Sequence, residues 1–268
     1  MSKKILITGA TDGIGLEAAK MFAALGHQIL LHGRNPEKIA AAEKILAELS
    51  NDGSVYSYQA DLSCPQEAKH LVERIKKDHQ TLDVLINNAG VLKTPVTVTL
   101  EGLDIRLVVN TITPYYLTLE LLPLMGHSGR VINLSSAAQA KVDTQAVLGK
   151  TRVDDMTAYA QSKLAIRLWT RYLARTLNKA SPKLLALNPG SLLASKMVKE
   201  GFGVKGNDIG IGAKAILRMA LEEDAEHHNG DYFDNDMGEF AALPMEHTSA
   251  NTSSELMDAI EEVLRKFY

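Results

Sequence analysis

Cysteine is almost absent from this chain: Cys64 is the only one in 268 residues. An intramolecular disulfide is therefore impossible, and the fold must be held by packing and hydrogen bonds. A chain without disulfides fits a reducing compartment, so we expect a cytoplasmic location. Because Cys64 lacks a basic neighbourhood that would favour its thiolate, we interpret it as a packing residue and not as a nucleophile.

Long apolar runs are absent as well. No stretch approaches the ~18 uninterrupted apolar residues that suggest a membrane span, and Ile5-Leu6-Ile7 is too short for a signal peptide. The net charge is only −3 and no basic stripe stands out, so nucleic acid is not an expected partner. The adjacent His227 and His228 lack cysteine or carboxylate at metal-ligand spacing, and we predict no metal site.

Short apolar runs alternate with longer helical patterns along the whole chain. Such an alternation indicates a parallel sheet covered by helices on both faces. No linker rich in proline, glycine or serine divides the chain. The expected fold class is α/β, with residues 1–268 forming a single doubly wound (Rossmann-type) dinucleotide-binding domain around a parallel sheet of about seven strands. The expected strands cover residues 4–8, 27–32, 55–59, 82–86, 130–134, 183–187 and 231–233, and long helical regions cover 100–125 and 157–178.

Two irregular segments lie near residues 137–155 and 192–207. In an open α/β sheet, ligands bind beyond the carboxyl ends of the strands, and both segments follow strands. Long irregular loops in compact domains are usually functional or mobile. We therefore expect these two loops to shape a substrate pocket.

A glycine-rich turn follows the first expected strand directly and opens the first helix. Glycine permits a tight turn and close approach of the backbone to phosphate, while the helix N-terminus offers free N–H groups and partial positive charge. The context of strand, glycine turn and helix predicts a site for a dinucleotide pyrophosphate. Its members are Gly9, Thr11, Asp12, Gly13, Ile14 and Gly15.

The end of the second strand bears on the choice of nicotinamide cofactor. A carboxylate about 20 positions after the glycines would bind a ribose 2′-hydroxyl, whereas an arginine suits a 2′-phosphate. The strand here ends in Gly33-Arg34-Asn35, with an arginine and no carboxylate at its tip. We predict NADP(H) in preference to NAD(H), although a solvated Arg34 is the alternative and Asp12 would repel a phosphate.

The third and fourth strands end in further candidate cofactor residues. Asp61 can accept a hydrogen bond from an adenine amino group, with Leu62 against the ring; a plain turn aspartate is the alternative. The run Asn88-Ala89-Gly90 follows the fourth strand, where short side chains and amides can tie loop backbones together beside a cofactor ribose. Taken alone, this run is an ordinary Asn/Gly turn.

Tyr159 and Lys163 lie four positions apart in a helical pattern, so their side chains share one face. A free tyrosine has a pKa near ~10, too high for an efficient base at neutral pH. A nearby ammonium favours the phenolate and lowers that pKa. The pair is therefore a candidate for acid/base chemistry.

The ordered series of motifs resembles the short-chain dehydrogenase/reductase family over about residues 3–234. The branch that it resembles most contains retinol dehydrogenases and related NADP(H)-linked carbonyl reductases. The motifs are the glycine turn, Asn87–Gly90, Asn110, Ser135-Ser136, Tyr159 with Lys163, and Asn188-Pro189-Gly190.

The resemblance implies a role for each matched catalytic position. Tyr159 corresponds to the general acid/base, and Lys163 to the residue that binds the nicotinamide ribose and lowers the tyrosine pKa. Ser136 corresponds to the residue that holds the substrate oxygen, with Ser135 as the competing candidate. Asn110 corresponds to the residue that positions a water in a proton relay.

Further matched positions lie at the nicotinamide end. Pro189 and Gly190 correspond to a turn that packs near the nicotinamide. Ser195 stands near the place of a hydroxyl residue that contacts the carboxamide, in a segment one residue longer than usual.

The chain departs from the family pattern at two places. Tyr159 follows Ser136 at a longer spacing than in most members, so residues 137–155 are expected to be an inserted loop over the pocket. The glycine that usually stands three positions after Asn110 is replaced by Thr113, which Pro114 follows. A proline inside a helix kinks it, and a kink here would aim the Asn110 carbonyl at water.

These observations predict an oxidoreductase that transfers a hydride between NADP(H) and a small-molecule carbonyl or alcohol. The alternative is an NADP(H)-sensing regulatory protein without catalysis, because fold does not determine function. The resemblance also suggests that the regions 100–125 and 157–178 pair between subunits in a homodimer or homotetramer. Their apolar residues fit packing within one chain equally well.

Overall fold

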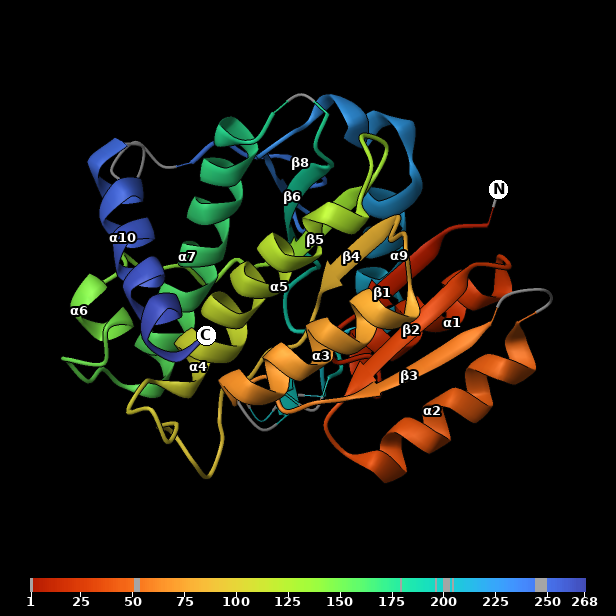
Figure 1. Ribbon diagram of the computed structural model, residues 1–268, viewed down its shortest axis with the longest axis horizontal. Coiled ribbons are helices and arrows are strands. Elements are labelled where there is room, and N and C mark those ends of the chain that lie inside the picture. The colour runs from red at the N-terminus through yellow and green to blue at the C-terminus, as the bar shows by residue number, and fades with distance from the viewer. Residues whose placement is uncertain are drawn as a thin grey trace.

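The strands form one sheet in the order β3-β2-β1-β4-β5-β6-β7-β8, in a single Rossmann-like α/β domain (Figure 1). The computed structural model describes residues 2–50, 54–178, 180–195, 197–199, 203, 205–243 and 250–268. Neighbouring strands from β3 to β7 are all parallel, which confirms the expected fold, and the short β8 adds an antiparallel edge to β7. The strands are β1 (Lys4–Ile7), β2 (Gln28–Gly33), β3 (Val55–Gln59), β4 (Val84–Asn87), β5 (Arg130–Leu134), β6 (Lys183–Asn188), β7 (Tyr232–Asp234) and β8 (Glu239–Phe240).

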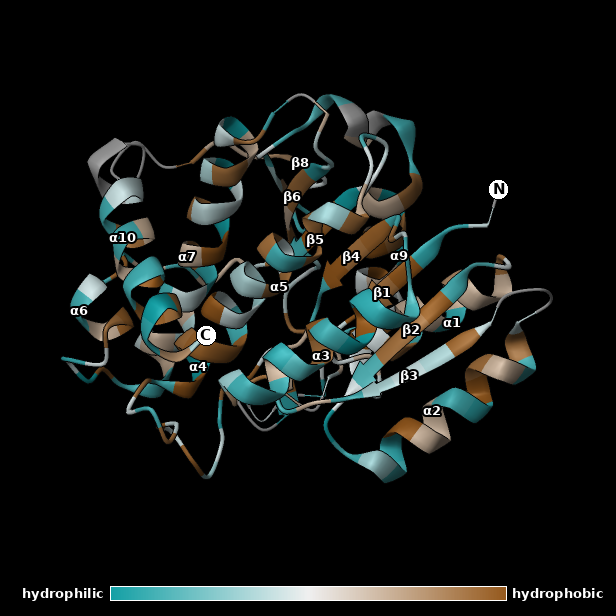
Figure 2. Cartoon of the chain, in the orientation of Figure 1, coloured by the Kyte–Doolittle hydropathy of each residue, from teal (hydrophilic) through white to brown (hydrophobic). Residues whose placement is uncertain are grey.

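The inner strands are apolar on both faces because helices cover both sides of the sheet. In β1, Leu6 contributes to the core under one helical layer, while Ile5 and Ile7 contribute to the core under the other. Figure 2 shows this as hydrophobic strands between helices with hydrophilic outer faces. This two-sided burial explains why the strands have near-continuous apolar sequences without a polar alternation.

One helical layer consists of α1 (Gly13–Ala24), α2 (Pro36–Leu49) and α9 (Ile209–Leu221). The opposite layer consists of α3 (Pro65–Asp78), α4 (Ile105–Leu107), α5 (Thr113–Leu121) and α7 (Asp155–Thr176). Further helical elements of the described chain are α6 (Thr144–Val147), α10 (Ala250–Phe267), the 3-10 turns η2 (Leu122–Leu124) and η3 (Glu223–His227), and the π-turn η1 (Val108–Ile112). Side chains of Asn35, Asp154 and Asp208 cap α2, α7 and α9 by accepting backbone N–H bonds.

The region 100–125 is not the long helix that its apolar pattern suggests. It divides into α4, the π-turn η1, α5 and η2. Pro114 lies in the first turn of α5, where its missing N–H cannot bond the Asn110 carbonyl four residues earlier. The chain takes a wider turn there instead, with the Thr113 N–H bonded to the Val108 carbonyl.

Helix α10 covers α6 and α7 from outside, as Figure 1 shows on the left of the molecule. Its buried Leu256 and Ile260 join the same apolar cluster as Trp169 of α7, which is fully buried and meets the ring of Tyr115 edge-on at 5.6 Å. The Tyr115 hydroxyl also donates to Glu261 of α10 at 3.2 Å. Apolar residues of α5 and α7 are therefore used for packing within this chain.

The parallel strands place their carboxyl ends along one edge of the sheet. The crossover between the two halves of the fold falls between β1 and β4, where ligands of doubly wound folds bind. The segments that follow β1, β2, β3, β4, β5 and β6 all emerge at this edge. Every sequence-predicted site residue except those on η1 and α7 lies in or directly after one of these segments.

Truncating Ile260 to alanine should test the docking of α10. Ile260 is fully buried, so Ile260→Ala should lower the free energy of unfolding by about 2–4 kcal/mol, measured by urea denaturation. The exposed Glu262 on the same helix provides the control, and Glu262→Ala should change stability by less than about 0.5 kcal/mol. Equal effects of the two substitutions would contradict this packing.

Candidate active site

The glycine turn wraps around the start of α1 in a conformation that requires glycine. Gly9 and Gly13 have φ of 65° and 58°, which L side chains rarely adopt. A Cβ added at Gly15 would lie 2.3 Å from the Asn88 Nδ2 atom, so this glycine lets the turn after β4 approach closely. At Gly13, by contrast, an added Cβ would have no neighbour nearer than 3.9 Å, which leaves space in front of the helix N-terminus.

Hydrogen bonds lock the glycine turn to the segment after β4. The Thr8 Oγ1 accepts the N–H groups of Asn88 and Ala89, both at 3.0 Å. The Asn88 amide in turn donates to the carbonyls of Thr8 at 2.8 Å and Gly9 at 3.1 Å. Asn88 and Ala89 thus hold the turn after β1 and the segment after β4 together, and Thr8 is a contributor that sequence reasoning missed.

His32 is a second missed residue. It is buried at the end of β2, where its Nδ1 accepts the Gly9 N–H at 3.1 Å and its Nε2 donates to the Ala60 carbonyl at 3.1 Å. Burial lowers the pKa of His32 to about 4, so the ring is neutral and this tautomer satisfies both bonds. His32 therefore ties the glycine turn to the end of β3.

The charged residues after β1 and β2 include one ion pair, between Lys38 and Asp12. Arg34 is exposed at the tip of β2, and Asn35 caps α2 by accepting the Lys38 N–H at 2.8 Å. The Lys38 ammonium reaches back to Asp12, 2.6 Å away. Asp12 also accepts the Gly13 N–H at 2.8 Å, so its negative charge is directed toward the helix and the lysine. The repulsion expected between Asp12 and a phosphate is correspondingly reduced.

Asp61 and Leu62 follow β3 in a tight turn. One oxygen of Asp61 accepts the N–H and the hydroxyl of Ser63, at 2.9 and 2.7 Å. The Asp61 N–H donates to Glu67 in the first turn of α3 at 2.6 Å. Leu62 is buried in the core beneath α5 and α3. This is the turn geometry that sequence analysis gave as the alternative for Asp61.

Tyr159, Ser136 and Lys163 converge at the carboxyl end of β5. Tyr159 and Lys163 share one face of α7, and the Lys163 ammonium lies 5.6 Å from the centre of the Tyr159 ring. The Ser136 side chain lies beside the Tyr159 hydroxyl, where it opposes part of the rise in the tyrosine pKa. The Lys163 ammonium donates to the Leu134 carbonyl at 2.8 Å.

The two serines after β5 face different neighbours. The Ser135 hydroxyl is buried and donates to the Lys163 carbonyl at 2.7 Å, which fixes α7 against β5. The Ser136 hydroxyl accepts the Ala138 N–H at 3.2 Å and faces Tyr159. Ser136 is therefore the serine that shares a site with the tyrosine.

Asn110 sits in the middle of the π-turn η1 and is fully buried. Its side-chain amide makes two hydrogen bonds to the backbone of Val91, accepting the N–H at 2.8 Å and donating to the carbonyl at 3.0 Å. It also donates to the Ser162 hydroxyl of α7 at 3.0 Å. Asn110 thus joins the segment after β4 to the helix that carries Tyr159 and Lys163.

Burial governs the protonation of both central groups. It raises the pKa of Tyr159 above its ordinary value, and the hydrogen bond with Ser136 opposes this shift. Burial lowers the pKa of Lys163 to about 8. Sequence analysis expected Lys163 to lower the tyrosine pKa; desolvation of the phenol dominates instead, because both side chains are almost excluded from water.

The turn after β6 is clamped by the hairpin of β7 and β8. Asp236 accepts the N–H of Ser191 at 2.8 Å, the Ser191 hydroxyl at 2.5 Å and the Asn188 amide at 2.9 Å. These bonds hold the pKa of Asp236 below its usual range against the effect of burial. Between the clamped ends lie Pro189 and Gly190, with Gly190 at φ 126°. Asp236 is a third residue that sequence reasoning missed.

Segments after β6 reach across the glycine turn. The Ser195 Cβ lies 3.9 Å from the place of a Cβ at Gly13, and the Met197 methyl lies 3.6 Å from that of a Cβ at Gly90. The expected loop 192–207 is described at 192–195, 197–199, 203 and 205–207, and its other residues lie outside the described part of the chain.

The expected loop 137–155 begins next to Ser136 and contains α6. Gln139 donates to the Ser136 carbonyl at 2.8 Å, and the Tyr232 hydroxyl donates to the same oxygen at 3.1 Å. The buried Arg167 of α7 lies over the Tyr232 ring at 4.0 Å and donates to Gln139 at 3.2 Å. Gln139 and Tyr232 thus fix the Ser136 backbone through its carbonyl, and Arg167 holds both of them in place.

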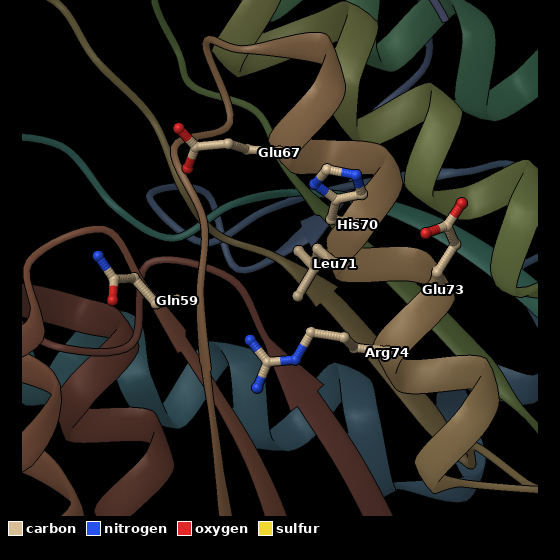
Figure 3. A pocket seen from close by; sticks show the side chains of 6 residues that line it. All are labelled: Gln59, Glu67, His70, Leu71, Glu73 and Arg74. Atoms are coloured by element: carbon tan, nitrogen blue, oxygen red, sulfur yellow. The ribbon is translucent and has the colours of Figure 1, made fainter.

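A surface cavity of about 430 Å³ lies beside the edge strand β3 and helix α3, and its lining residue Glu67 accepts the Asp61 N–H (Figure 3). The residues that line it are Gln59, Glu67, His70, Leu71, Glu73 and Arg74. They carry charges of both signs, and none of them is a predicted site residue. Among the described residues, no group of three or more His, Cys, Asp or Glu side chains is placed to hold a metal ion. No helix in the described ranges is long and apolar enough to cross a membrane.

Residues at the sheet edge fit a dinucleotide. The space at Gly13 lies at a helix N-terminus, where backbone N–H groups favour a phosphate. The exposed Arg34 lies at the tip of β2. The buried ammonium of Lys163 lies beside Gly90, 3.6 Å from where a Cβ added at that glycine would be. Cationic groups thus lie after β2 and beside Gly90 after β4, the two strands that flank β1.

Comparison with known proteins agrees with this arrangement. The family model described as short chain dehydrogenase matches residues 3–202. Retinol dehydrogenase 12 from Mus musculus is 34% identical over 245 residues, which cover 86% of this chain and 77% of that protein.

Two solved structures have a similar fold. A crystal structure of an uncharacterised protein from Mycobacterium paratuberculosis superposes with a TM-score of 0.81 at 24% identity, covering 98% of this chain and 93% of that one, and shows the shared fold. The landomycin C-6 ketoreductase LanV, solved with bound NADP and rabelomycin, gives a TM-score of 0.68 at 25% identity, covering 87% of this chain and 94% of that one. The chain belongs to the short chain dehydrogenase family of oxidoreductases, in its retinol dehydrogenase-like branch.

Proposed function

We propose that this protein transfers a hydride between NADP(H) and a carbonyl or alcohol substrate, with Tyr159 as the general acid/base. The observation that carries the proposal is the convergence of Tyr159, Ser136 and Lys163 at the sheet edge, with the Lys163 ammonium 5.6 Å from the centre of the Tyr159 ring and Ser136 beside the tyrosine hydroxyl. Asn110 connects this cluster to the segment after β4. A dinucleotide sensor would need the glycine turn but not this set of residues.

In the reductive direction, the substrate oxygen would lie between the Ser136 and Tyr159 hydroxyls. NADP(H), when bound, supplies or accepts the hydride at carbon. Ser136 would hold the oxygen by a hydrogen bond while Tyr159 delivers the proton to it. The neutral phenol suits this task, because burial raises its pKa and keeps it protonated at neutral pH.

Lys163 and Asn110 would return a proton to Tyr159 from solvent through water. The Asn110 side chain is occupied by Val91 and Ser162, so its part in a relay would fall to its backbone carbonyl. Pro114 has no N–H to give to that carbonyl, which keeps the acceptor available to a water. The π-turn thereby replaces the kink expected from the sequence.

The cofactor contacts follow the sheet edge. The pyrophosphate would lie at the turn Gly9–Gly15 and the start of α1, near Thr11, Asp12 and Ile14. The adenosine would lie at Arg34, Asn35, Asp61 and Leu62, and the nicotinamide between Gly90 and the residues Pro189, Gly190 and Ser195. Arg34 would attract a 2′-phosphate, and Lys38 would offset the charge of Asp12, so that Asp12 repels the phosphate less.

Names of the relatives favour a carbonyl or alcohol as the substrate class, since they include a retinol dehydrogenase and a ketoreductase. The loops near 137–155 and 192–207 would close the pocket over it. The homodimer or homotetramer and the cytoplasmic location stay predictions.

Tyr159→Phe should lower kcat/KM for carbonyl reduction by at least about 10²-fold, because it removes the proton donor. The measurement follows NADPH absorbance with a panel of aldehydes and ketones. The NADPH Kd, measured by fluorescence titration, should change less than about twofold. Tyr172→Phe is the matched control, since Tyr172 is an exposed tyrosine on the same helix. Retained activity in Tyr159→Phe would refute the assignment.

Reversing the charge at the tip of β2 should weaken the preference for NADPH. Arg34→Asp should raise the KM for NADPH by about tenfold or more and leave that for NADH little changed, because a charge-assisted phosphate contact is lost. Lys44→Asp makes the same charge change on the exposed face of α2 and serves as the control. If both variants weaken NADPH alike, Arg34 does not recognise the 2′-phosphate.

Lys163 should make the stability of the cofactor-free protein depend on pH. Its pKa falls to about 8 on folding, from 10.5 in the unfolded chain. Between these values the unfolded chain binds more protons, so raising the pH through this window favours the folded state. The free energy of unfolding of wild type relative to Lys163→Met should rise by at most about 1.4 kcal/mol per pH unit from pH 8 to 10. A difference that stays constant with pH, measured by urea denaturation, would contradict the lowered pKa.

A further inference from the structure

Thr113, which stands where the family pattern has glycine, bridges two distant parts of the chain. It is fully buried at the start of α5. Its hydroxyl donates to the Leu62 carbonyl at 2.8 Å, and its oxygen lies 2.5 Å from the Tyr268 hydroxyl. A threonine hydroxyl has one proton, so Tyr268 must donate to Thr113 while Thr113 donates to Leu62.

Tyr268 follows α10, whose apolar face is buried over α6 and α7 through Leu256, Ile260 and Val263. The Tyr268 N–H bonds the Leu264 carbonyl, and its ring meets that of Tyr116 at 4.7 Å between centroids. Packing thus fixes the ring, and the bond with Thr113 aims its hydroxyl inward.

The other end of this chain of hydrogen bonds is Leu62, at the adenine end of the proposed cofactor site. Glu67 of α3 holds Asp61 from one side through the Asp61 N–H. Thr113 holds the next carbonyl from the side of α5. Thr113 also follows Asn110 by three residues, so the same short segment touches both the adenine end and the π-turn.

We propose that Tyr268 and Thr113 are positioning residues that hold the Asp61-Leu62 turn in its cofactor-binding conformation. Docking of α10 thereby sets the affinity for the adenine end of NADP(H), although no residue of α10 lies in the cofactor contacts proposed above. The inference rests on the proposed function, since it assigns a role to the Asp61-Leu62 turn in cofactor binding.

The test uses substitutions that remove one hydroxyl at a time and keep the shape. Thr113→Val should raise the NADPH Kd and KM by about three- to tenfold, the effect of one lost buried hydrogen bond on a positioned loop. Tyr268→Phe should also raise the NADPH Kd. Because the two hydrogen bonds act in series, the Kd of the double variant should exceed that of Thr113→Val by no more than about twofold. Thr113→Ser, which keeps the hydroxyl, should bind NADPH as wild type does. The kcat at saturating NADPH should stay within about twofold in all of them.

Tyr115→Phe is the matched control, because it removes the α10 bond to Glu261 but touches no part of the link to Leu62. It should leave the NADPH Kd unchanged. An unchanged NADPH Kd in Thr113→Val and Tyr268→Phe would overturn this inference and leave the proposed function intact. An equal rise of the Kd in Tyr115→Phe would also overturn it, since that would show a general effect of loosening α10. Wild type that binds no NADPH in the same titration would overturn the proposed function together with this inference.

Discussion

The arrangement of the site depends on one unfavourable placement, a lysine ammonium inside the protein beside the carboxyl end of β5. Lys163 is almost excluded from water, and burial lowers its pKa to about 8. Its ammonium is stabilised by the Leu134 carbonyl, and its own carbonyl accepts the Ser135 hydroxyl. The same residue is thus bonded to β5 through both its side chain and its backbone, which fixes the rotation of α7 and with it the direction of Tyr159.

Neighbouring elements are adjusted to this placement. An α-helical Asn110 would have its carbonyl bonded by the residue four positions on, but that residue is Pro114, and the chain opens into a π-turn there. The turn brings the Asn110 amide between Val91 and Ser162, so the segment after β4 is bonded to α7 one residue from Lys163. The lysine, the π-turn and the two loops therefore form one connected structure.

Sequence patterns predicted the parts of this structure that depend on local chemistry. The buried strands and the glycine turn follow from residue type and period. The π-turn did not, because its apolar residues recur at spacings that an ordinary helix shares. The two-residue β8 was missed because it exists only through pairing of Phe240 with Phe233. The raised pKa of Tyr159 could not be foreseen from the spacing to Lys163, because desolvation depends on what covers both side chains.

The bonds that place the site residues come mostly from side chains outside the motifs. His32, Thr8, Asp236 and Thr113 each accept or donate two or more hydrogen bonds between loops that are far apart in sequence. A typical hydrogen bond adds only about 1 kcal/mol to stability, but a buried polar group without its partner costs about 1–3 kcal/mol. A loop that shifts would leave such groups unsatisfied, so these bonds restrict geometry more than they raise stability. Hydride and proton transfer both require reacting atoms at short, fixed distances. We therefore infer that these residues would support the proposed catalysis by fixing the loops that carry the site, although none of them would touch the substrate.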